Sequence, residues 1–250
     1  MGATRFCRIF GLALVMACLA AAGASADSES VVCFGDSATA GASHLSFPDY
    51  LEFFIEPGDG EVSNEGESGE TTADGLWRML GYLITFKYVD SKVWTYMEGG
   101  NDLIDWVIDA DPLLLYDPLD PDYPLRDELN QKLNEIKKNL RSGIQDIHFW
   151  TSAEVVLGTY YYLSSYTICD PSPIGFLTPA MAEKANHYVD ELNDQIRDLA
   201  AEEGVPLADL NEIFGDFGGH NLFYHDCNHV NDLGNFFVAL AWWLQIAPLL

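Results

Sequence analysis

The hydrophobic positions of this chain fall into short apolar runs that alternate with longer amphipathic stretches. A short run bounded by turn residues is typical of a buried strand, and apolar positions that repeat every three or four residues are typical of a helix. This alternation favours a parallel sheet covered by helices on both faces, with ligands bound at the carboxyl ends of the strands. The predicted strands are 30–35, 61–64, 92–97, 154–160 and 205–208, and the predicted helices are 46–55, 72–88, 125–147, 179–203 and 231–247.

The clearest helix signal follows Thr178-Pro179, because proline favours the first position of a helix. The helix is expected to end near Gly204. Its predicted buried face carries Tyr188, Leu192, Ile196 and Leu199.

Residues 1–26 have the composition of a secretory signal peptide. Arg5 and Arg8 precede an apolar segment, which is followed by the small-residue sequence Ala24-Ser25-Ala26. The apolar segment is short for a membrane span. A lipoprotein anchored through Cys18 is disfavoured, because Met16 stands where a small residue is expected. We therefore expect a secreted or periplasmic protein in which residues 27–250 form a single domain.

The charge balance excludes several classes of partner. Twelve Lys and Arg residues face 39 Asp and Glu residues, for a net charge of −27. Such a surface repels nucleic acid and anionic membranes. The chain has no cluster of basic residues of the kind that binds an anionic cofactor, so neither a cofactor nor a nucleic-acid partner is expected. The apolar C-terminal stretch 236–250 is short and contains Pro248, which favours a packed core helix over a membrane anchor.

Two features leave alternatives open. Cys33 lies in a predicted strand and is expected to be a buried apolar residue, whereas Cys169 and Cys227 fall in loops and could form a disulfide in an oxidising compartment. The stretch 102–127 is rich in Asp and Pro. A solvated acidic loop at the rim of the site is favoured there over a calcium site, because the spacing of the acidic residues fits no calcium-binding loop.

The first segment with chemical meaning is Val31–Gly41, in which four apolar residues lead directly into Gly35-Asp36-Ser37. A serine on a sharp turn between a strand and a helix projects from the sheet. Its own backbone amide lies at a helix N-terminus, where partial positive charge gathers. This is a suitable position for a nucleophile, although the same tripeptide also serves as an ordinary helix cap.

Three further segments follow predicted strands or precede the last helix. Asn64–Thr72 contains two glycines that let backbone amides approach a ligand, and Glu98–Asp102 places the Asn101 side chain at the same edge of the sheet. Each of these two could also be a turn or a helix cap. In the last segment, Asp226 precedes His229 by three residues, so the carboxylate can hold one imidazole nitrogen while the other accepts a proton from Ser37.

Two other interpretations compete with this one. His225, Cys227 and His229, with His220, could bind zinc, but that site would leave the Gly-Asp-Ser and Gly-Gly-Asn-Asp segments without a purpose. A secreted carbohydrate- or lipid-binding protein could use aromatic side chains for stacking, although core packing is the better interpretation of side chains in or beside strands. The aromatic side chains concerned are Trp94, Trp106, Tyr160, Tyr161 and Tyr162.

The four segments together resemble the GDSL-type esterases and lipases of the SGNH hydrolase superfamily. The matching motifs are F-G-D-S (34–37), S-G-E-T-T (68–72), G-G-N-D (99–102) and D-x-x-H (226–229), and V-P-L-A-D-L (205–210) fits the strand before the last motif. The resemblance covers most of the chain after residue 26. It is strongest to the small secreted bacterial esterases, thioesterases and lysophospholipases.

The resemblance implies a fold, a site and a reaction. The fold is a three-layer α/β/α sandwich with a central parallel sheet of about five strands, flavodoxin-like in topology. Ser37, Asp226 and His229 are implied as the catalytic triad, and the Ser37 amide, the Gly69 amide and the Asn101 side chain as the oxyanion hole. No metal or cofactor is implied. The expected activity is hydrolysis of carboxylic esters, with thioesters, lysophospholipids and acetylated polysaccharides as alternative substrates.

The sequence departs from the family pattern at two positions near the site. Ala38 replaces the usual leucine after the serine, and Val230 follows the histidine where proline is common, which is expected to loosen the base. The acyl group, the alcohol and the oligomeric state stay open. The residues that line the acyl pocket are expected within 73–82, 102–125 and 160–177.

Overall fold

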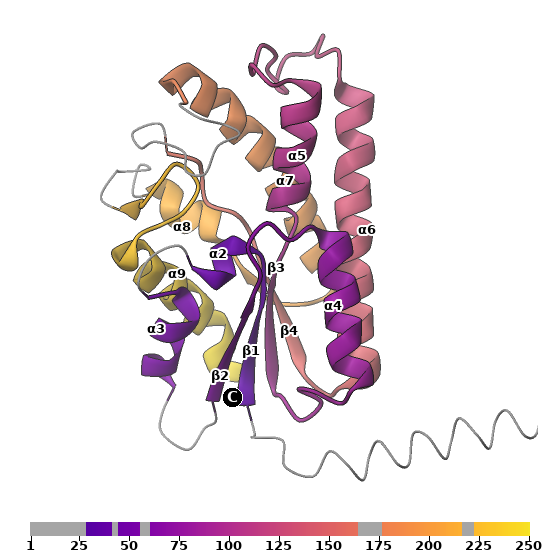
Figure 1. Ribbon diagram of the computed structural model, residues 1–250, viewed down its shortest axis with the longest axis vertical. Coiled ribbons are helices and arrows are strands. Elements are labelled where there is room, and N and C mark those ends of the chain that lie inside the picture. Colours follow the sequence, from indigo (N-terminus) through magenta and orange to yellow (C-terminus); the bar gives the residue numbers. More distant parts are fainter. Residues whose placement is uncertain (1–28, 42–44, 56–60, 165–176, 217–222) are drawn as a thin grey trace, which may run out of the picture.

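The sheet of this protein has five parallel strands in the order β2-β1-β3-β4-β5 (Figure 1). The computed structural model describes residues 29–41, 45–55, 61–164, 177–216 and 223–250. This strand order is the flavodoxin-like one, in which ligands bind where the order reverses, beyond the carboxyl ends of β1 and β3. The strands are β1 (Glu29–Gly35), β2 (Glu61–Gly66), β3 (Val93–Met97), β4 (Glu154–Gly158) and β5 (Leu207–Ala208).

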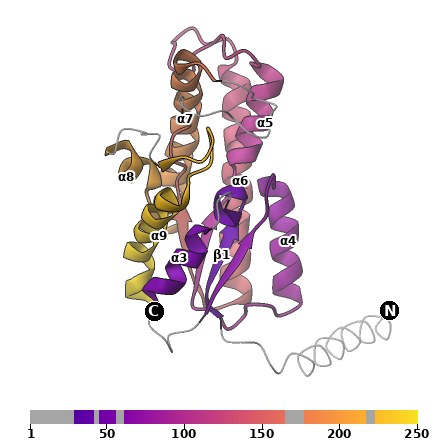
Figure 2. The same ribbon diagram turned by 60° about the vertical axis from the view of Figure 1, so that its left-hand side comes forward.

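Helices cover both faces of the sheet and make it the middle of three layers (Figures 1 and 2). Those on one face are α4 (Thr72–Ile84), α5 (Gly100–Ala110), α6 (Arg126–Trp150) and α7 (Pro179–Glu203). Those on the other are α3 (Phe47–Phe54), α8 (Leu210–Asp216) and α9 (Asp232–Ile246). The short helix α2 (Ser37–Ala40) follows β1, and a 3₁₀ turn, η2 (Ala247–Leu249), follows α9.

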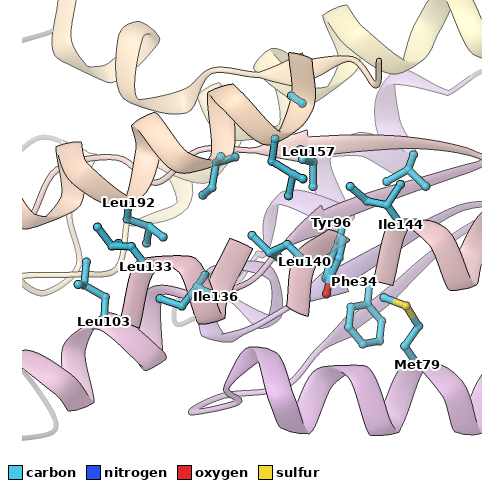
Figure 3. Close-up of a cluster of buried hydrophobic side chains, with 14 of the residues drawn as sticks. Phe34, Met79, Tyr96, Leu103, Leu133, Ile136, Leu140, Ile144, Leu157 and Leu192 are labelled. Carbon is cyan, nitrogen blue, oxygen red and sulfur yellow. The ribbon is translucent and has the colours of Figure 1, made fainter. Parts of the chain in front are cut away.

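Alternation along the strands divides the core into two clusters. Val32 and Phe34 of β1 pack toward α4 and α6, whereas Val31 and Cys33 pack toward α3 and α9. Side chains of a strand point to opposite faces in turn, so a strand covered on both faces reads as a continuous apolar run. Figure 3 shows the first cluster, in which Phe34, Met79 and Tyr96 lie at one end and Leu103, Leu133 and Leu192 at the other.

The fold class predicted from the sequence is confirmed, and most elements lie where the pattern placed them. All five strands are present, and the helix predicted at 179–203 has those same bounds. The helix predicted at 72–88 is shorter than expected, because α4 ends at Ile84. Phe86 and Tyr88 after it have positive φ angles of 61° and 65°, which no right-handed helix accommodates.

The prediction of a solvated loop over 102–127 was wrong in its first half, because α5 extends to Ala110. Leu103, Ile104 and Val107 form an apolar stripe of helical spacing, while Asp105 and Asp109 are exposed on the other side. The many acidic residues of this stretch obscured the helical spacing of its apolar residues in the sequence. Helix α8 was also missed, since seven residues hold too few repeats to register as helical.

The acidic residues that follow α5 accept hydrogen bonds from the turns of their own loop. Asp111 accepts from the amides of Leu115 and Tyr116, at 2.8 and 3.0 Å. Asp117 accepts from the Leu119 amide at 2.9 Å and lies 2.9 Å from the His187 ring. Within the described ranges, no group of three or more His, Cys, Asp or Glu side chains is placed to hold a metal ion.

Several predictions concern the ends of the chain and its cysteines. The proposed signal peptide, residues 1–26, lies outside the described residues. Trp242 is fully buried in α9, and no helix in the described part combines the length and hydropathy needed to cross a bilayer. Cys33 is buried and free as predicted, and burial raises its pKa to about 12. Cys227 is disulfide-bonded, and Cys169 lies outside the described residues.

Candidate active site

The turn after β1 places Ser37 at the first position of α2. Asp36 is the N-cap of this helix, and its Oδ1 accepts a hydrogen bond from the Ala38 amide at 2.9 Å. Gly35 is required at this turn, because a Cβ there would collide with the Met97 carbonyl oxygen and the Thr39 side chain. The tight packing between β1 and β3 therefore fixes where the serine projects.

The predicted triad residues lie in one hydrogen-bonded chain. Ser37 Oγ lies 2.9 Å from His229 Nε2, and His229 Nδ1 lies 2.8 Å from Asp226 Oδ2. The other carboxylate oxygen of Asp226 accepts the amides of Asn228 and His229, at 2.9 and 2.7 Å. A carboxylate that holds Nδ1 leaves Nε2 to accept the serine proton, which is the arrangement for nucleophilic attack by a serine.

The charge of Asp226 is stabilised by its neighbours. Burial acts to raise its pKa, but the hydrogen bonds from the His229 ring and from the two backbone amides outweigh burial and hold the pKa below the usual range. Asp226 is therefore ionised at neutral pH. An ionised carboxylate beside Nδ1 orients the imidazole and favours its protonated form when a proton arrives.

The loop that carries Asp226 and His229 is closed by backbone pairing. Tyr224 and Val230 form an antiparallel bridge, and the His225 amide donates to the His229 carbonyl at 2.9 Å. Val230 is buried in this bridge. The expectation that valine in place of proline loosens the base is not supported by this geometry, because the pairing holds the histidine in place.

The three groups predicted for an oxyanion hole come from three different elements. Ser37 contributes an amide at the start of α2, Gly69 an amide in the loop after β2, and Asn101 a side chain in the first turn of α5. Gly69 has a φ of 82°, a left-handed conformation that favours glycine. One N–H of the Asn101 amide donates to the Glu70 carbonyl at 2.8 Å, which leaves its second N–H for a ligand.

The second and third motifs are joined by additional hydrogen bonds that were not predicted from the sequence. Asp102 accepts hydrogen bonds from the Thr72 amide at 2.7 Å and from the Thr72 hydroxyl at 3.1 Å. The Thr72 hydroxyl also accepts from the Asn139 side chain at 2.9 Å. Together with the bond between Asn101 and Glu70, these contacts fix the loop after β2 against the start of α5.

A hollow opens beside Ser37 and Asn101. It encloses about 540 Å³, including the space open to solvent at its mouth. Its walls are mainly apolar and include Leu103, Ile104, Tyr160, Leu163, Val189 and Leu192. An apolar hollow with a few convergent polar groups is the usual form of a small-molecule site.

Comparison with families of known proteins decides the relationship. The model of the GDSL-like lipase/acylhydrolase family matches residues 33–235, which span all four motifs. The chain belongs to this family. It is therefore an ester-hydrolysing enzyme with the α/β fold of the SGNH hydrolases.

Solved structures of GDSL enzymes share this fold at low sequence identity. A lipolytic G-D-S-L protein from Veillonella parvula is 18% identical with a TM-score of 0.61, covering 88% of this chain and 98% of its own. A lipase/acylhydrolase from Enterococcus faecalis is 22% identical with a TM-score of 0.61, covering 88% and 96%. An acetylxylan esterase from Geobacillus stearothermophilus is 18% identical with a TM-score of 0.61, covering 89% and 95%. Comparison with curated protein sequences gives no match.

A group of acidic and basic side chains, Glu70, Arg78 and Glu98, lies in or beside the motifs of this GDSL enzyme. Arg78 of α4 pairs with Glu70, with Nε donating to Oε1 at 2.7 Å, and its guanidinium lies 4.0 Å from the centre of the Phe34 ring. Glu98 is buried, and in the described part of the chain neither of its carboxyl oxygens has a hydrogen-bond partner. Burial and the negative charges of Asp36 and Glu70 raise the pKa of Glu98 well above its usual value.

Tyr160 is a further site residue whose place the sequence did not reveal. Its hydroxyl donates to Asp36 Oδ2 at 2.6 Å, and its ring packs against Gly100. Asn193 of α7 holds the Tyr160 backbone with two hydrogen bonds of 2.8 Å. Burial raises the pKa of Asp36 to about 6, although the bonds from Tyr160 and the Ala38 amide act to lower it. An aromatic residue after a strand gives no sequence signal of such a contact.

The geometry also bears on the two competing interpretations. Both nitrogens of His229 face Ser37 and Asp226 rather than a shared point with His225, and His220 lies outside the described residues. Of the aromatic residues considered for stacking, Trp94 and Tyr161 are buried in the core and Trp106 packs against the Tyr188 ring. Tyr160 and Tyr161 both line the hollow, and the half-buried residue of the two is Tyr160, whose hydroxyl is bonded to Asp36.

Proposed function

We propose that this GDSL enzyme is a secreted serine esterase in which Ser37 is the nucleophile, His229 the general base and Asp226 the residue that orients it. The observation that carries the proposal is the continuous chain from Ser37 Oγ through both nitrogens of His229 to Asp226, with distances of 2.9 and 2.8 Å. In this assignment the neutral imidazole of His229 accepts the serine proton through Nε2.

In the first half of the reaction, Ser37 Oγ attacks the carbonyl carbon of an ester and passes its proton to His229 Nε2. The resulting oxyanion is stabilised by the amides of Ser37 and Gly69 and by the second N–H of Asn101. When the intermediate collapses, the bond between the carbonyl carbon and the alkoxy oxygen breaks. His229 returns the proton to this oxygen, the alcohol leaves, and the acyl group stays on Ser37.

In the second half, water replaces the alcohol. His229 takes a proton from water as the oxygen attacks the acyl carbon, and the same three donors stabilise the second oxyanion. The bond to Ser37 Oγ then breaks, and His229 gives the proton back to the serine. The carboxylic acid leaves, and the enzyme is restored without a change in oxidation state.

Secretion is supported by the leader-like composition of residues 1–26 and by the disulfide at Cys227. Disulfides persist in oxidising compartments and are rare in the cytosol. The N-terminal sequence of the exported protein is expected to begin at Asp27. A protein that stays in the cytosol with residues 1–26 attached would contradict this part of the proposal.

The esterase activity is tested with p-nitrophenyl esters of two-, four-, eight- and twelve-carbon acids, using the parent and Ser37→Ala. The substitution is expected to lower kcat by at least about 10⁴-fold, because the nucleophile has no substitute in this mechanism. Ser152→Ala is the matched control, since Ser152 is exposed at a distance from the four motifs in the sequence and is expected to leave kcat unchanged.

Full activity of a folded Ser37→Ala variant would exclude the serine mechanism. A parent that hydrolyses none of the four esters would favour a binding protein or an enzyme restricted to acetylated polysaccharide. Release of acetate from acetylated xylan then distinguishes these two.

A further inference from the structure

A second hollow lies between α5 and α7, next to the one beside Ser37. It encloses about 690 Å³, including the space open to solvent. Both helices rise beyond the carboxyl ends of the strands, where the four motifs meet (Figure 1). The two hollows are adjacent, because four residues line both: Leu103, Ile104, Leu163 and Val189.

The lining of the second hollow is apolar almost throughout. Ile104, Val107 and Ile108 of α5 face Met181 and Ala185 of α7 across it. The three α5 side chains are only half-buried, because this space separates them from the helix they face. Binding of an apolar ligand removes this apolar surface from water, which lowers the free energy.

The polar groups that line the hollow, on Asp111 and Tyr188, already have partners. The Tyr188 hydroxyl lies 2.9 Å from the Tyr123 hydroxyl and 3.4 Å from Asp111 Oδ2. Asp111 also accepts two backbone amides of the following turn. These groups need no polar ligand, so the hollow suits a chain that carries no polar group at its end.

One wall of the hollow is held in a strained conformation. Leu114 has a backbone φ of 48°, which is uncommon for residues other than glycine, asparagine or aspartate. Its amide donates to the Asp111 carbonyl at 2.8 Å, and its own carbonyl accepts from Lys184 Nζ at 3.0 Å. Backbone strain is retained where surrounding bonds enforce it, and it is concentrated at functional sites.

The loop that carries this wall also exposes large apolar side chains. Leu113, Leu115 and Leu119 are 64%, 64% and 60% exposed. These exposed leucines lie on the loop that also carries Leu114 of the hollow, so they add apolar surface to the same part of the molecule. The surface beside the hollow therefore suits the same kind of ligand as its interior.

The geometry points to the hollow between α5 and α7 as the binding site for the acyl chain of the substrate, which makes this enzyme selective for carboxylic esters of about eight to twelve carbons. This inference rests on the proposed function, because it places the ester carbonyl at Ser37 and the chain along the shared wall formed by Leu103 and Val189. An acetyl group would leave most of both hollows unfilled.

The test compares kcat/KM for p-nitrophenyl butyrate and p-nitrophenyl decanoate, both below their solubility limits. The parent is expected to prefer decanoate by at least about tenfold, since each fully buried methylene contributes up to about fourfold. Ala185→Phe fills the hollow from α7 and is expected to reduce this preference about tenfold, mainly through KM. Met181→Trp acts at a half-buried position of the same wall and covers the case in which Ala185→Phe fails to fold.

Ala180→Phe is the matched control, because Ala180 is exposed on the same helix and lines neither hollow. It is expected to keep the preference of the parent. Ser37-dependent hydrolysis of butyrate with no preference for decanoate, or a preference that both filling variants retain, would overturn the assignment of the acyl site alone. Absence of Ser37-dependent hydrolysis of either ester would instead overturn the proposed function.

Discussion

At the Ser37 end of the binding region, nearly every polar side chain is paired, whereas the hollow between α5 and α7 is lined by apolar side chains that face open space. Ser37, His229 and Asp226 are joined by bonds of 2.9 and 2.8 Å. Among the described residues that line the hollow, Asp111 and Tyr188 alone carry hydrogen-bonding side chains, and these bond to protein. The reaction needs groups fixed before the substrate arrives, while an acyl chain needs only shape and exclusion of water.

The largest effect on catalysis is expected at Asp226, the residue that orients the general base His229. Asp226→Asn is expected to lower kcat by about 10⁴-fold, because an amide holds the imidazole in the wrong tautomer for accepting the serine proton. Steady-state kinetics with p-nitrophenyl butyrate measures the loss. Asp120→Asn, at an exposed residue of the acidic loop, is the control and is expected to leave kcat unchanged. Equal rates for the two variants would remove Asp226 from the mechanism.

A smaller effect is expected at the oxyanion hole. Asn101→Ala removes one donor and is expected to lower kcat by about 10²–10³-fold with little change in KM, because the donor acts mainly on charge that develops in the transition state. The bond from Asn101 to the Glu70 carbonyl is lost as well, so circular dichroism should confirm that the fold is retained. A change confined to KM would assign Asn101 to substrate binding instead.

The acidic loop and the four motifs show which parts of the site a sequence can predict. The proposed triad residues and oxyanion donors lie within short motifs, and local rules account for part of their geometry: Asp226 reaches His229 across three residues, and Gly35 permits the turn before Ser37. The bond from Tyr160 to Asp36 spans 124 residues, and no local pattern encodes it. The hollow depends likewise on the packing of α5 against α7, and α5 itself was hidden by its many aspartates.

The bond between Tyr160 and Asp36 yields a prediction for stability. Tyr160→Phe leaves a buried carboxylate oxygen without its donor and is expected to lower the free energy of unfolding by about 1–3 kcal/mol at pH 8. The pKa of Asp36 is about 6, and removing the donor raises it further. The folded state therefore holds the Asp36 proton more tightly than the unfolded state, and its stability falls as the pH rises through 6.

The loss in Tyr160→Phe should accordingly be larger at pH 8 than at pH 5, where the carboxyl is mostly protonated. Urea denaturation at the two pH values measures the difference. Tyr162→Phe removes a tyrosine donor to Asp190 at a half-buried position and should show a smaller loss at pH 8. Equal losses at both pH values for Tyr160→Phe would contradict the role of Asp36.

A gradual, pH-dependent effect on stability is expected at Glu98, the buried acid without a hydrogen-bond partner among the described residues. Its pKa in the folded state is raised well above the usual value, so its contribution to stability is lost as the pH rises toward that pKa. Glu98→Gln removes this titration and should flatten the alkaline slope of the free energy of unfolding by up to about 1.4 kcal/mol per pH unit. Identical slopes for the variant and the parent between pH 6 and 9 would show that Glu98 is already ionised.

The central claim, that Ser37 forms a covalent acyl-enzyme with His229 as its base, is tested most directly by labelling with a fluorophosphonate and measuring the intact mass. One adduct per chain is expected, located on the peptide that contains Ser37, absent from Ser37→Ala and formed far more slowly in His229→Ala. An adduct on another residue, or a folded and active parent that takes up no label, would contradict it.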